Sequence, residues 1–464
     1  MNWFELATAR KDELLKELQQ LISIESVLDE SAATEDAPFG PKPLEALEYL
    51  LHLGAEQGMT TKNVANVAGH IEMGQGDELI GVLGHVDVVP AGDGWSVPPF
   101  EGRIVGSKMI GRGTIDDKGP TMAAWMAMKL VKDSGIPLER RVRLIIGTDE
   151  ESGFRCVRRY FETEEMPTLG FAPDADFPII NAEKGIAGIE LSQSSTNEAS
   201  SLVFFQSGER TNMVPDEANA LLELPLSELE ASFQKFLFAN NLKGKAQNVN
   251  GKTSLIVSGK SSHAMEPDNG INAAVKLAEF LVTLNIGGQG AKFVKTLVDA
   301  FGSDSRGKTF DGYFSDEMSG ETTYNAGVLH FVREEGFTIK VSMRYSVSAP
   351  FEELVEKITD YFKQNKVDVR VSSNSGPHYV DASDELIQTL STVYERQTGE
   401  KAELLAIGGG TYARVLKKGV AFGMVFPGEA DVAHQADEFV DIKNLLKATA
   451  IYADALAELA GKKD

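Results

Sequence analysis

The stretch that decides the fold, residues 78–87, reads ELIGVLGHVD. Its apolar run Leu79–Leu83 shows no alternation with polar residues, which is typical of a strand buried on both faces. His85 and Asp87 follow this strand and flank a single residue, so on extended chain their side chains point the same way. A metal-bound imidazole usually donates its other ring N–H to a carboxylate or a carbonyl, and Asp87 can accept it. Taken alone, the pair is more often a loop histidine beside a solvated aspartate, so further ligands must decide.

Acidic residues follow two further apolar runs. Glu150 and Glu151 come after Val142–Ile146, and Asp174 comes after Leu169–Ala172. In an open parallel sheet, ligands bind beyond the carboxyl ends of the strands, so these acids and the histidine are expected to converge. Acidic clusters are usually only solvated. At a strand end, however, the two glutamates can have different roles: one can bind a metal ion while the other accepts a proton.

A glycine-rich turn, residues 111–120, reads GRGTIDDKGP and runs into a helix predicted over Pro120–Val131. Asp116 precedes that helix, where its carboxylate could bridge two cations. Alternatively, Asp116 and Asp117 could cap the helix and interact with its dipole. The turn lacks the Lys-Ser/Thr ending of a phosphate-binding loop, so it does not predict nucleotide binding.

The candidate metal ligands are two histidines and three carboxylates, one of the carboxylates being shared. They are His85, Asp116, Glu151, Asp174 and His434. This donor set predicts two divalent ions, with zinc as the first choice and manganese or cobalt as alternatives. A water between two such ions is acidic enough to attack a carbonyl near neutral pH, and Glu150 could serve as its base.

The character of the chain changes near Gly185 and changes back after Asp381. Residues between these points form alternating segments, typical of strands with one solvated face, with helical stretches between them. We therefore predict an α/β catalytic domain, residues 1–185 and 381–464, with a mixed, mostly parallel sheet flanked by helices. Residues 186–380 are predicted to form an inserted α+β lid or substrate domain. Short strands are expected at Leu404–Ile407 and Val420–Val425.

Composition narrows the class of partner. The 464-residue chain has a formal net charge of −24, which repels phosphate backbones and anionic lipids, so nucleic acid and membrane surfaces are not expected partners. No apolar run approaches the roughly 20 residues of a membrane span, and the N-terminus is amphipathic rather than signal-like, so a cytoplasmic location is expected. The single cysteine, Cys156, permits no intramolecular disulfide. No histidine lies near it in sequence, so we expect a buried, inert thiol rather than a nucleophile.

Four motifs carry a family resemblance by their order and spacing. They are Gly84–Pro90, Gly111–Gly119, Glu150–Glu151 and Pro173–Asp174. Through them the chain resembles the zinc peptidase family of carnosinases, desuccinylases and carboxypeptidase G. Within that family it looks most like bacterial dipeptidases of the PepV type, because of Gly408–Tyr412, His434–Glu438 and the large inserted domain. In PepV-type enzymes the double-sized lid replaces a neighbouring subunit, so the resemblance implies a monomer.

The resemblance implies separate roles for the candidate residues. Asp116 would bridge the two metal ions, and the peptide bond between Asp116 and Asp117 would be cis. Glu150 would be the general base, and Asp87 would orient the histidine of the first motif. The remaining ligands would be His85 and Asp174 at one metal site, and Glu151 and His434 at the other.

The resemblance also assigns roles around the inserted domain. His263 would steady the oxyanion, Asn212 would polarise the substrate, and Arg344 would hold the terminal carboxylate of the substrate. Backbone N–H groups around Gly410 and Thr411 would bind the same end. From the sequence alone, Arg344 could be a surface charge and His263 an ordinary loop residue.

Glu266 departs from the family pattern, because relatives usually have a small residue at this position. An acid so close to His263 could shift local charge and substrate preference. Since some candidate residues lie in the inserted domain, we expect closure of this lid to assemble the active site.

The predicted reaction is hydrolysis of unblocked dipeptides, with Xaa-His and β-alanyl dipeptides among the candidate substrates. Recognition of both ends would limit the enzyme to short peptides. The alternative is an N-acyl amino acid deacylase on the same fold, which needs an acyl pocket and no recognition of a free amine. A non-catalytic metal-binding protein is disfavoured by Glu150, because a base is dispensable for binding.

Overall fold

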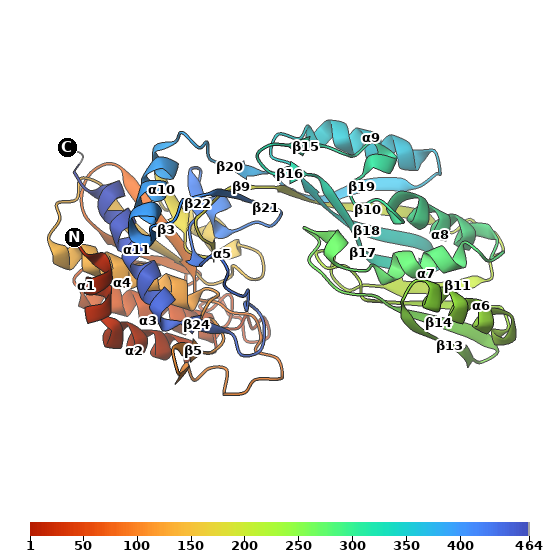
Figure 1. Cartoon of the computed structure of the whole chain (residues 1–464), viewed down its shortest axis with the longest axis horizontal. Helices are drawn as coiled ribbons and strands as arrows, with labels where there is room; N and C mark the ends of the chain where they lie inside the picture. Colours follow the sequence, from red (N-terminus) through yellow and green to blue (C-terminus); the bar gives the residue numbers. More distant parts are fainter. Residues whose placement is uncertain (463–464) are drawn as a thin grey trace. The chain divides into compact units, whose positions relative to one another are not determined.

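The structure, a computed structural model, describes residues 1–462 and divides into two compact units (Figure 1). The first unit consists of Met1–Asn181, Tyr379–Leu405 and the chain from Gly410 onward. The second unit consists of Ala182–His378 and Ala406–Gly409. The sequence had placed Ala406–Gly409 in the catalytic domain. They group with the second unit because Lys184 N donates to Ile407 O and the Arg344 guanidinium donates to Gly408 O.

A mixed sheet forms the centre of the first unit, which agrees with the predicted fold class. Its order is β1-β2-β6-β3-β7-β22-β9-β20, and β21 pairs with β9. The four strands β6, β3, β7 and β22 are parallel to one another, and antiparallel strands flank them. The bounds are β1 Thr60–Val64, β2 Ala68–Met73, β3 Leu79–His85, β6 Arg141–Gly147, β7 Leu169–Ala172, β9 Ile179–Glu183, β20 His378–Tyr379, β21 Leu404–Ile407 and β22 Gly419–Ala421.

Short strands complete this unit, and the predicted strand Val420–Val425 differs from what the structure shows. They are β4 Arg103–Val105, β5 Lys108–Ile110 and β24 Phe439–Asp441 in one small sheet, and β8 Ala175–Asp176 with β23 Met424–Val425 in another. Val420–Val425 was expected to be one strand, but it is broken between β22 and β23. The break falls at Gly423, whose φ of 85° is incompatible with a continuous strand.

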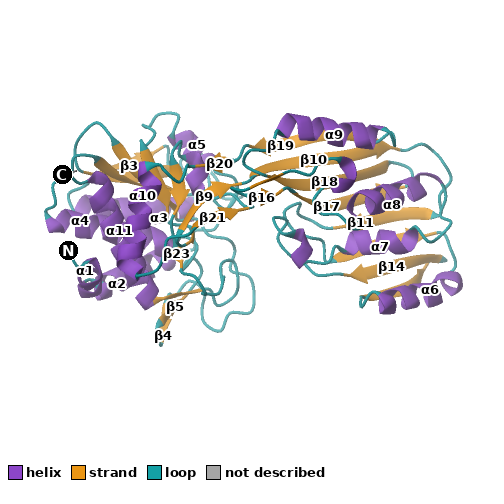
Figure 2. Cartoon of the chain, turned by 45° about the horizontal axis from the view of Figure 1, so that its top comes forward, coloured by secondary structure: helices purple, strands orange, loops and turns teal. Residues whose placement is uncertain are grey.

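Helices cover the first sheet and bury its apolar faces (Figure 2). The buried helix α4 is the central one, because every residue from Lys118 to Val131 is shielded from solvent. A helix that is apolar on nearly all sides must pack within a core rather than on a surface. The bounds are α1 Trp3–Ala9, α2 Lys11–Ile22, α3 Pro41–Glu56, α4 Lys118–Ser134, α5 Arg155–Tyr160, α10 Glu385–Thr398, α11 Ile442–Ala460 and the 3₁₀ turn η3 Tyr412–Val415.

The second unit has a sheet and a hydrophobic core of its own. All neighbouring strands are antiparallel in the order β13-β14-β12-β11-β17-β18-β10-β19. Buried and partly buried residues alternate along β10, as expected for a strand with one core-facing side. The strand bounds are β10 Gly185–Ser194, β11 Leu202–Ser207, β12 Glu217–Leu222, β13 Lys243–Val249, β14 Lys252–Ser258, β17 Thr323–Val332, β18 Gly336–Tyr345 and β19 Asp368–Ser375.

Four helices pack with this second sheet. Helix α7 begins at a side-chain cap, because Asn272 Oδ1 accepts hydrogen bonds from the N–H groups of Ala274 and Val275. The helices are α6 Leu226–Ala239, α7 Ala273–Leu281, α8 Gly288–Phe301 and α9 Phe351–Lys363, with 3₁₀ turns η1 Pro267–Asn269 and η2 Lys308–Phe310 and a hairpin of β15 Ser315–Asp316 and β16 Gly320–Glu321.

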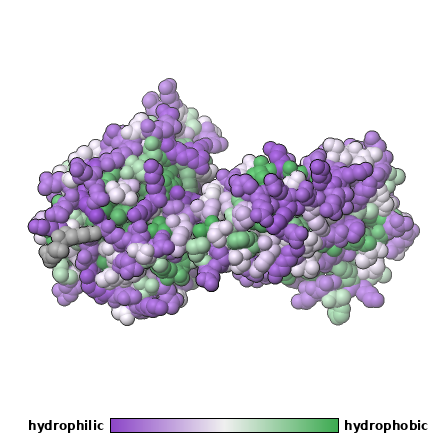
Figure 3. All heavy atoms as spheres, turned by 90° about the horizontal axis from the view of Figure 1, so that it is seen from above, coloured by the Kyte–Doolittle hydropathy of each residue, from purple (hydrophilic) through white to green (hydrophobic). Residues whose placement is uncertain are grey.

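The surface is mainly polar on the face that Figure 3 shows, with apolar residues scattered over it. Among residues 1–462, no helix has both the length and the apolar character that a membrane crossing requires.

Candidate active site

Three neighbouring parallel strands end at the candidate metal site. His85 is the last residue of β3 and pairs in register with Gly147, the last residue of β6. Glu150 and Glu151 follow β6 directly, and Asp174 follows β7. Because β6, β3 and β7 are parallel neighbours, these side chains leave the sheet at the same edge. The order of the strands thus explains why residues far apart in sequence converge.

The turn before α4 brings Asp116 to the same edge. The peptide bond between Asp116 and Asp117 is cis, as predicted. Asp117 Oδ2 accepts hydrogen bonds from His85 N at 2.9 Å and Thr121 Oγ1 at 2.9 Å, which joins the turn to the end of β3. A Cβ on Gly119 would lie 2.0 Å from the carbonyl oxygen of Thr114, so only glycine allows the helix to begin so close to the turn.

The five predicted ligands form two groups that share Asp116. In the first group, His85 Nε2 lies 3.3 Å from Asp116 Oδ1 and 3.4 Å from Asp174 Oδ2. In the second, His434 Nε2 lies 2.9 Å from Asp116 Oδ2 and 3.1 Å from Glu151 Oε1. Each oxygen of Asp116 therefore faces a different histidine, which is the arrangement that a bridging carboxylate requires.

The chemistry of these groups fits divalent cations. His85 Nε2 is completely buried and has no hydrogen-bond partner among the described residues, yet it points at two carboxylates. Like charges brought together in a buried site are costly unless cations or protons compensate them. Imidazole and carboxylate donors are those that zinc and manganese accept. The residues present thus fit a metal-binding role.

Asp87 contacts the two glutamates of the site as well as His85, which is more than the sequence predicts. His85 Nδ1 lies 3.0 Å from the backbone oxygen of Asp87 and 3.3 Å from its Oδ1, so Nδ1 carries the proton and Nε2 is free to bind a metal. The two carboxylate oxygens of Asp87 also accept hydrogen bonds from the N–H groups of Glu150 and Glu151, each at 3.1 Å. One buried aspartate therefore fixes a histidine ligand and the pair of glutamates together.

Glu150 has the environment of a proton carrier. Burial raises the pKa of its carboxyl well above the ordinary value, His85 opposes this rise, and the carboxylates of Asp174 and Glu151 add to it. A carboxyl with a raised pKa can both accept and return a proton near neutral pH. In the described residues it belongs to neither ligand group.

A buried ion pair, which the sequence did not reveal, joins the two ligand-bearing loops. Glu438 Oε2 pairs with Arg112 Nη1 at 2.5 Å, and Oε1 accepts hydrogen bonds from the N–H groups of Gly113 and Ile115, each at 2.9 Å. Burial raises the pKa of Glu438 to about 7. The pair ties the turn that carries Asp116 to the segment that follows His434. In the sequence, both residues lie inside motifs that carry the family resemblance, Gly111–Gly119 and His434–Glu438, but nothing there indicates that they pair.

Cys156 and Tyr412 pack behind the metal site. Cys156 is completely buried, its Sγ lies 2.9 Å from Tyr412 Oη, and burial raises its thiol pKa to about 12. A neutral, buried thiol is a poor nucleophile, in line with the expected inert role. The Tyr412 ring meets the His85 ring edge-on, with centroids 5.8 Å apart, and so limits rotation of that ligand.

The predicted glycine loop is divided between the two units. Gly408 belongs to the second unit, whereas Gly410 and Thr411 belong to the first. Thr411 is buried, and its Oγ1 accepts a hydrogen bond from Ala413 N at 3.1 Å, which caps η3. Its hydroxyl oxygen thus has a structural role in addition to the proposed substrate contact.

Within the second unit, three predicted substrate residues lie close together. His263 forms a backbone bridge with Met213, and Ala264 N donates to Asn212 O at 2.8 Å. Burial and the nearby Arg344 guanidinium lower the pKa of His263, which keeps the imidazole neutral. Arg344 is itself buried, so it is not the surface charge that the sequence alone allowed.

Two histidine–carboxylate groups that share an aspartate, placed at the strand ends of an α/β unit, define the class of metal-dependent hydrolases. The chain belongs to the peptidase family described as "Peptidase family M20/M25/M40", whose model matches residues 81–458. It is therefore a metallopeptidase. The predicted membership of a metallopeptidase family is confirmed.

Relatives support this assignment over the whole length. The chain is 49% identical over 466 residues to a Bacillus subtilis (strain 168) protein named "Putative dipeptidase YtjP", covering 99% of this chain and 100% of that one. Among solved structures it resembles human carnosine dipeptidase 1, with a TM-score of 0.56, 15% identity and 98% of each chain covered. It also resembles the carboxypeptidase Sso-CP2 from Sulfolobus solfataricus, with a TM-score of 0.58 and 14% identity, covering 96% of this chain and 98% of that one. At these identities the two structures support the fold alone.

Proposed function

We propose that this chain is a metal-dependent dipeptidase that hydrolyses the amide bond of unblocked dipeptides. The observation that carries the proposal is the pair of ligand groups sharing Asp116, with the buried Glu150 beside them. The full-length relative named as a dipeptidase supports the choice of substrate class over an N-acyl amino acid deacylase.

Two divalent ions are proposed as the cofactor, with zinc as the first choice and manganese or cobalt as alternatives. Asp116 would be shared between them. The other ligands would be His85 and Asp174 for one ion, and Glu151 and His434 for the other. When bound, such ions polarise a carbonyl and make a nearby water acidic enough to attack it.

Glu150 is proposed to move the proton of the reaction. Its carboxylate takes a proton from the attacking water and then delivers it to the amine that leaves, so the peptide bond breaks without releasing a free amide anion. Asp87 holds the backbone of Glu150 in place through the hydrogen bond to its N–H. The raised pKa of Glu150 suits both halves of this transfer.

Three residues of the second unit, together with the backbone around Gly410 and Thr411 of the first, are proposed to recognise the substrate. His263 donates a hydrogen bond to the developing oxyanion, and Asn212 polarises the scissile group. Arg344 offers two N–H groups to the free carboxylate, and the backbone around Gly410 and Thr411 assists at the same end. Recognition of both free ends limits the enzyme to short peptides, with Xaa-His and β-alanyl dipeptides as candidates.

Hydrolysis of a matched substrate panel tests the proposal. Metal-stripped protein would be restored with zinc, manganese or cobalt and assayed on dipeptides, their N-acetyl and N-succinyl derivatives, and tripeptides. We expect turnover of unblocked dipeptides only after metal is restored. Faster hydrolysis of N-acylated amino acids would instead identify a deacylase and overturn the proposal.

The protein is further proposed to act as a monomer, since the second unit carries an eight-stranded sheet of its own. Light scattering during size-exclusion chromatography should give the mass of one chain, 50.3 kDa. A mass of two chains would contradict this.

A further inference from the structure

The loop that carries His263 is held at its base and on one flank by backbone hydrogen bonds. Lys260 and Ile271 form a bridge that closes its base. Ala264 N donates to Asn212 O at 2.8 Å on the flank. Neither contact reaches the tip of the loop, which includes Glu266 and Asp268. Ser305 Oγ donates to Asp268 Oδ1 at 2.6 Å and Thr323 Oγ1 donates to Met265 O at 3.3 Å, so the group at the tip that still needs an anchor is the Glu266 side chain.

Arg306 supplies that anchor. Its Nη2 lies 3.0 Å from Glu266 Oε2 and 3.0 Å from Asp268 Oδ2, and its Nε lies 3.4 Å from Glu321 Oε2. The Arg306 side chain is 19% exposed, whereas those three carboxylates are 48%, 61% and 42% exposed. One enclosed guanidinium thus gathers three more exposed acids. Isolated surface pairs contribute little, but a shared guanidinium fixes the geometry of several partners at once.

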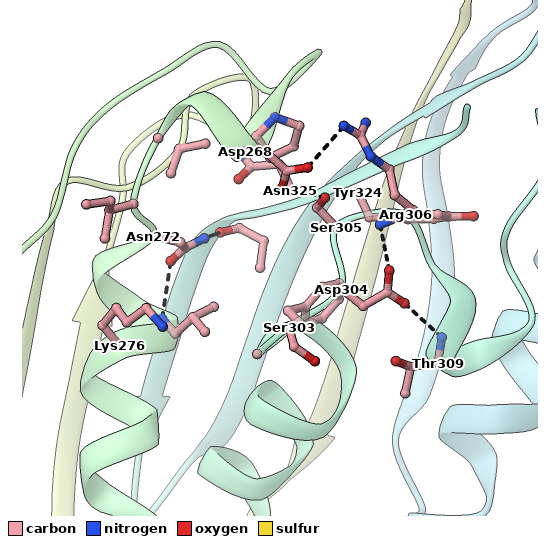
Figure 4. Close-up of a pocket in the computed structure, with 18 of the residues that line it drawn as sticks. Asp268, Asn272, Lys276, Ser303, Asp304, Ser305, Arg306, Thr309, Tyr324 and Asn325 are labelled. Carbon is pink, nitrogen blue, oxygen red and sulfur yellow. Dashed lines mark hydrogen bonds and ion pairs between the residues drawn. The ribbon is translucent and has the colours of Figure 1, made fainter. Parts of the chain in front are cut away.

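Arg306 is itself fixed to the sheet. Asp304 Oδ1 accepts a hydrogen bond from Arg306 N at 2.9 Å, and Asp304 Oδ2 accepts one from Thr309 N at 2.8 Å. Ser305 O accepts a hydrogen bond from Tyr324 N of β17 at 2.7 Å. In Figure 4, dashed lines join the Arg306 guanidinium to Asp268, and the Asp304 carboxylate to Thr309 and to the backbone of Arg306. The anchor is therefore a rigid one.

The tip of the loop determines which nitrogen of His263 carries a proton. Met265 N lies 3.2 Å from His263 Nδ1. A backbone N–H can only donate, so Nδ1 accepts, and in the neutral ring the proton must sit on Nε2. Glu266 N also donates to His263 O at 3.1 Å, which closes a tight turn around the histidine. The N–H that fixes the imidazole thus belongs to Met265, which directly precedes Glu266, a partner of Arg306.

We propose that Arg306 is a positioning residue for His263. By holding Glu266 and Asp268, it keeps Met265 N–H against Nδ1 and so maintains Nε2–H as the donor. Glu266, which departs from the family pattern, then acts as a loop anchor rather than as an acid that contacts substrate. This inference rests on the proposed function for its effect on catalysis, but not for its effect on the imidazole.

The pocket beside Arg306 makes a substitution practicable. Arg306 lines a cavity of about 540 Å³, so a shorter or apolar side chain can be accommodated without overpacking. Arg333 offers a matched control in the same unit. Its guanidinium pairs with Glu223 and Glu334, neither of which belongs to the His263 loop.

The experiment compares R306M, R306K and R333M in zinc-loaded protein. Histidine ¹⁵N–¹H correlation spectra report the tautomer directly, and the His263 signal is identified by its loss in H263Q. In the wild type we expect Nε2 protonated and Nδ1 unprotonated. R306M should give mixed or exchanging tautomers, R306K should restore part of the wild-type signal, and R333M should leave it unchanged.

Kinetics supply the second readout. The Nε2–H of His263 is proposed to stabilise the transition state and not the bound substrate. If R306M loosens it, kcat should therefore fall about 10- to 100-fold while KM changes less than about threefold. R333M should remain within about twofold of the wild type. A wild-type tautomer signal in R306M would overturn the proposal, whether or not thermal stability falls. If no dipeptide is hydrolysed but the tautomer still changes, the proposed function fails and the positioning role stands.

Discussion

The two units fix their candidate residues by different means. In the first unit, three candidate ligands lie at or soon after the ends of neighbouring parallel strands, and the buried carboxylates of Asp87 and Glu438 accept hydrogen bonds from backbone N–H groups of the site. In the second unit, His263 lies on a loop whose tip is held by partly exposed ion pairs of Arg306. The comparison indicates that strand order sets the geometry of the candidate metal ligands, whereas a few polar anchors hold the proposed substrate residue His263.

The largest expected effect is at Glu150, the proposed proton carrier, which belongs to neither ligand group. In Glu150→Gln we expect kcat to fall by about 10²–10⁴, because general acid–base catalysis is typically of that size. Metal content, measured by mass spectrometry of the purified protein, should match that of the wild type. Loss of metal together with activity would place Glu150 among the ligands and contradict its separate role.

The next effect concerns the buried pair that joins the two ligand-bearing loops. Glu438→Gln keeps the shape of the side chain but removes the charge that Arg112 faces. We expect metal affinity to fall about 10- to 100-fold, since groups that orient ligands typically have effects of that size. Competition with a fluorescent chelator measures it. Unchanged affinity would show that the strand ends alone hold the site.

A smaller effect is expected for substrate recognition by Arg344. In Arg344→Lys the charge remains but bidentate hydrogen bonding is lost, so kcat/KM should fall roughly tenfold for free dipeptides. Dipeptide amides, which lack the carboxylate, provide the control and should lose little. An equal loss on both substrates would mean that Arg344 does not bind the carboxylate.

A separate effect, on stability and not on activity, tests whether a histidine outside the site is purely structural. Burial, with help from Arg143 and Lys62, lowers the pKa of His70 to about 4, while Glu164 opposes this. The stability it contributes is present above an unfolded pKa of about 6.5 and is lost as pH falls toward 4. Between pH 7 and pH 5 the free energy of unfolding of the wild type should fall by about 2 kcal/mol more than that of His70→Gln. Urea denaturation at both pH values measures this, and equal losses would contradict the burial effect.

Sequence predicted the parts of the site that follow from local pattern. An apolar run with a ligand at its carboxyl end identifies both the strand and the position of His85, and the same reasoning covers Asp174. Contacts between segments far apart in the chain leave no such pattern in the sequence, so they could not be predicted from it. Glu438 lies 326 residues from Arg112, and nothing in either neighbourhood indicated that their charges pair in the core.

Two predicted boundaries differ from the structure for different physical reasons. Val420–Val425 has the composition of a strand, but the positive φ of Gly423 interrupts it. Ala406–Gly409 continues an α/β pattern, yet hydrogen bonds from Lys184 and Arg344 bind it to the second unit. The predicted influence of Glu266 on charge and substrate preference stays a prediction, and its carboxylate pairs with Arg306. For Ala406–Gly409 the deciding partners lie far away in sequence, whereas for Val420–Val425 the break lies within the segment itself.

The central claim is that two metal ions share Asp116 while Glu150 stays outside their ligand groups. A crystal structure of zinc-loaded protein, with anomalous diffraction measured at the zinc edge, tests it directly. The account predicts two anomalous peaks, one beside His85 and Asp174 and one beside Glu151 and His434, with an oxygen of Asp116 bound to each ion. A single peak, or Glu150 bound directly to an ion, would contradict it.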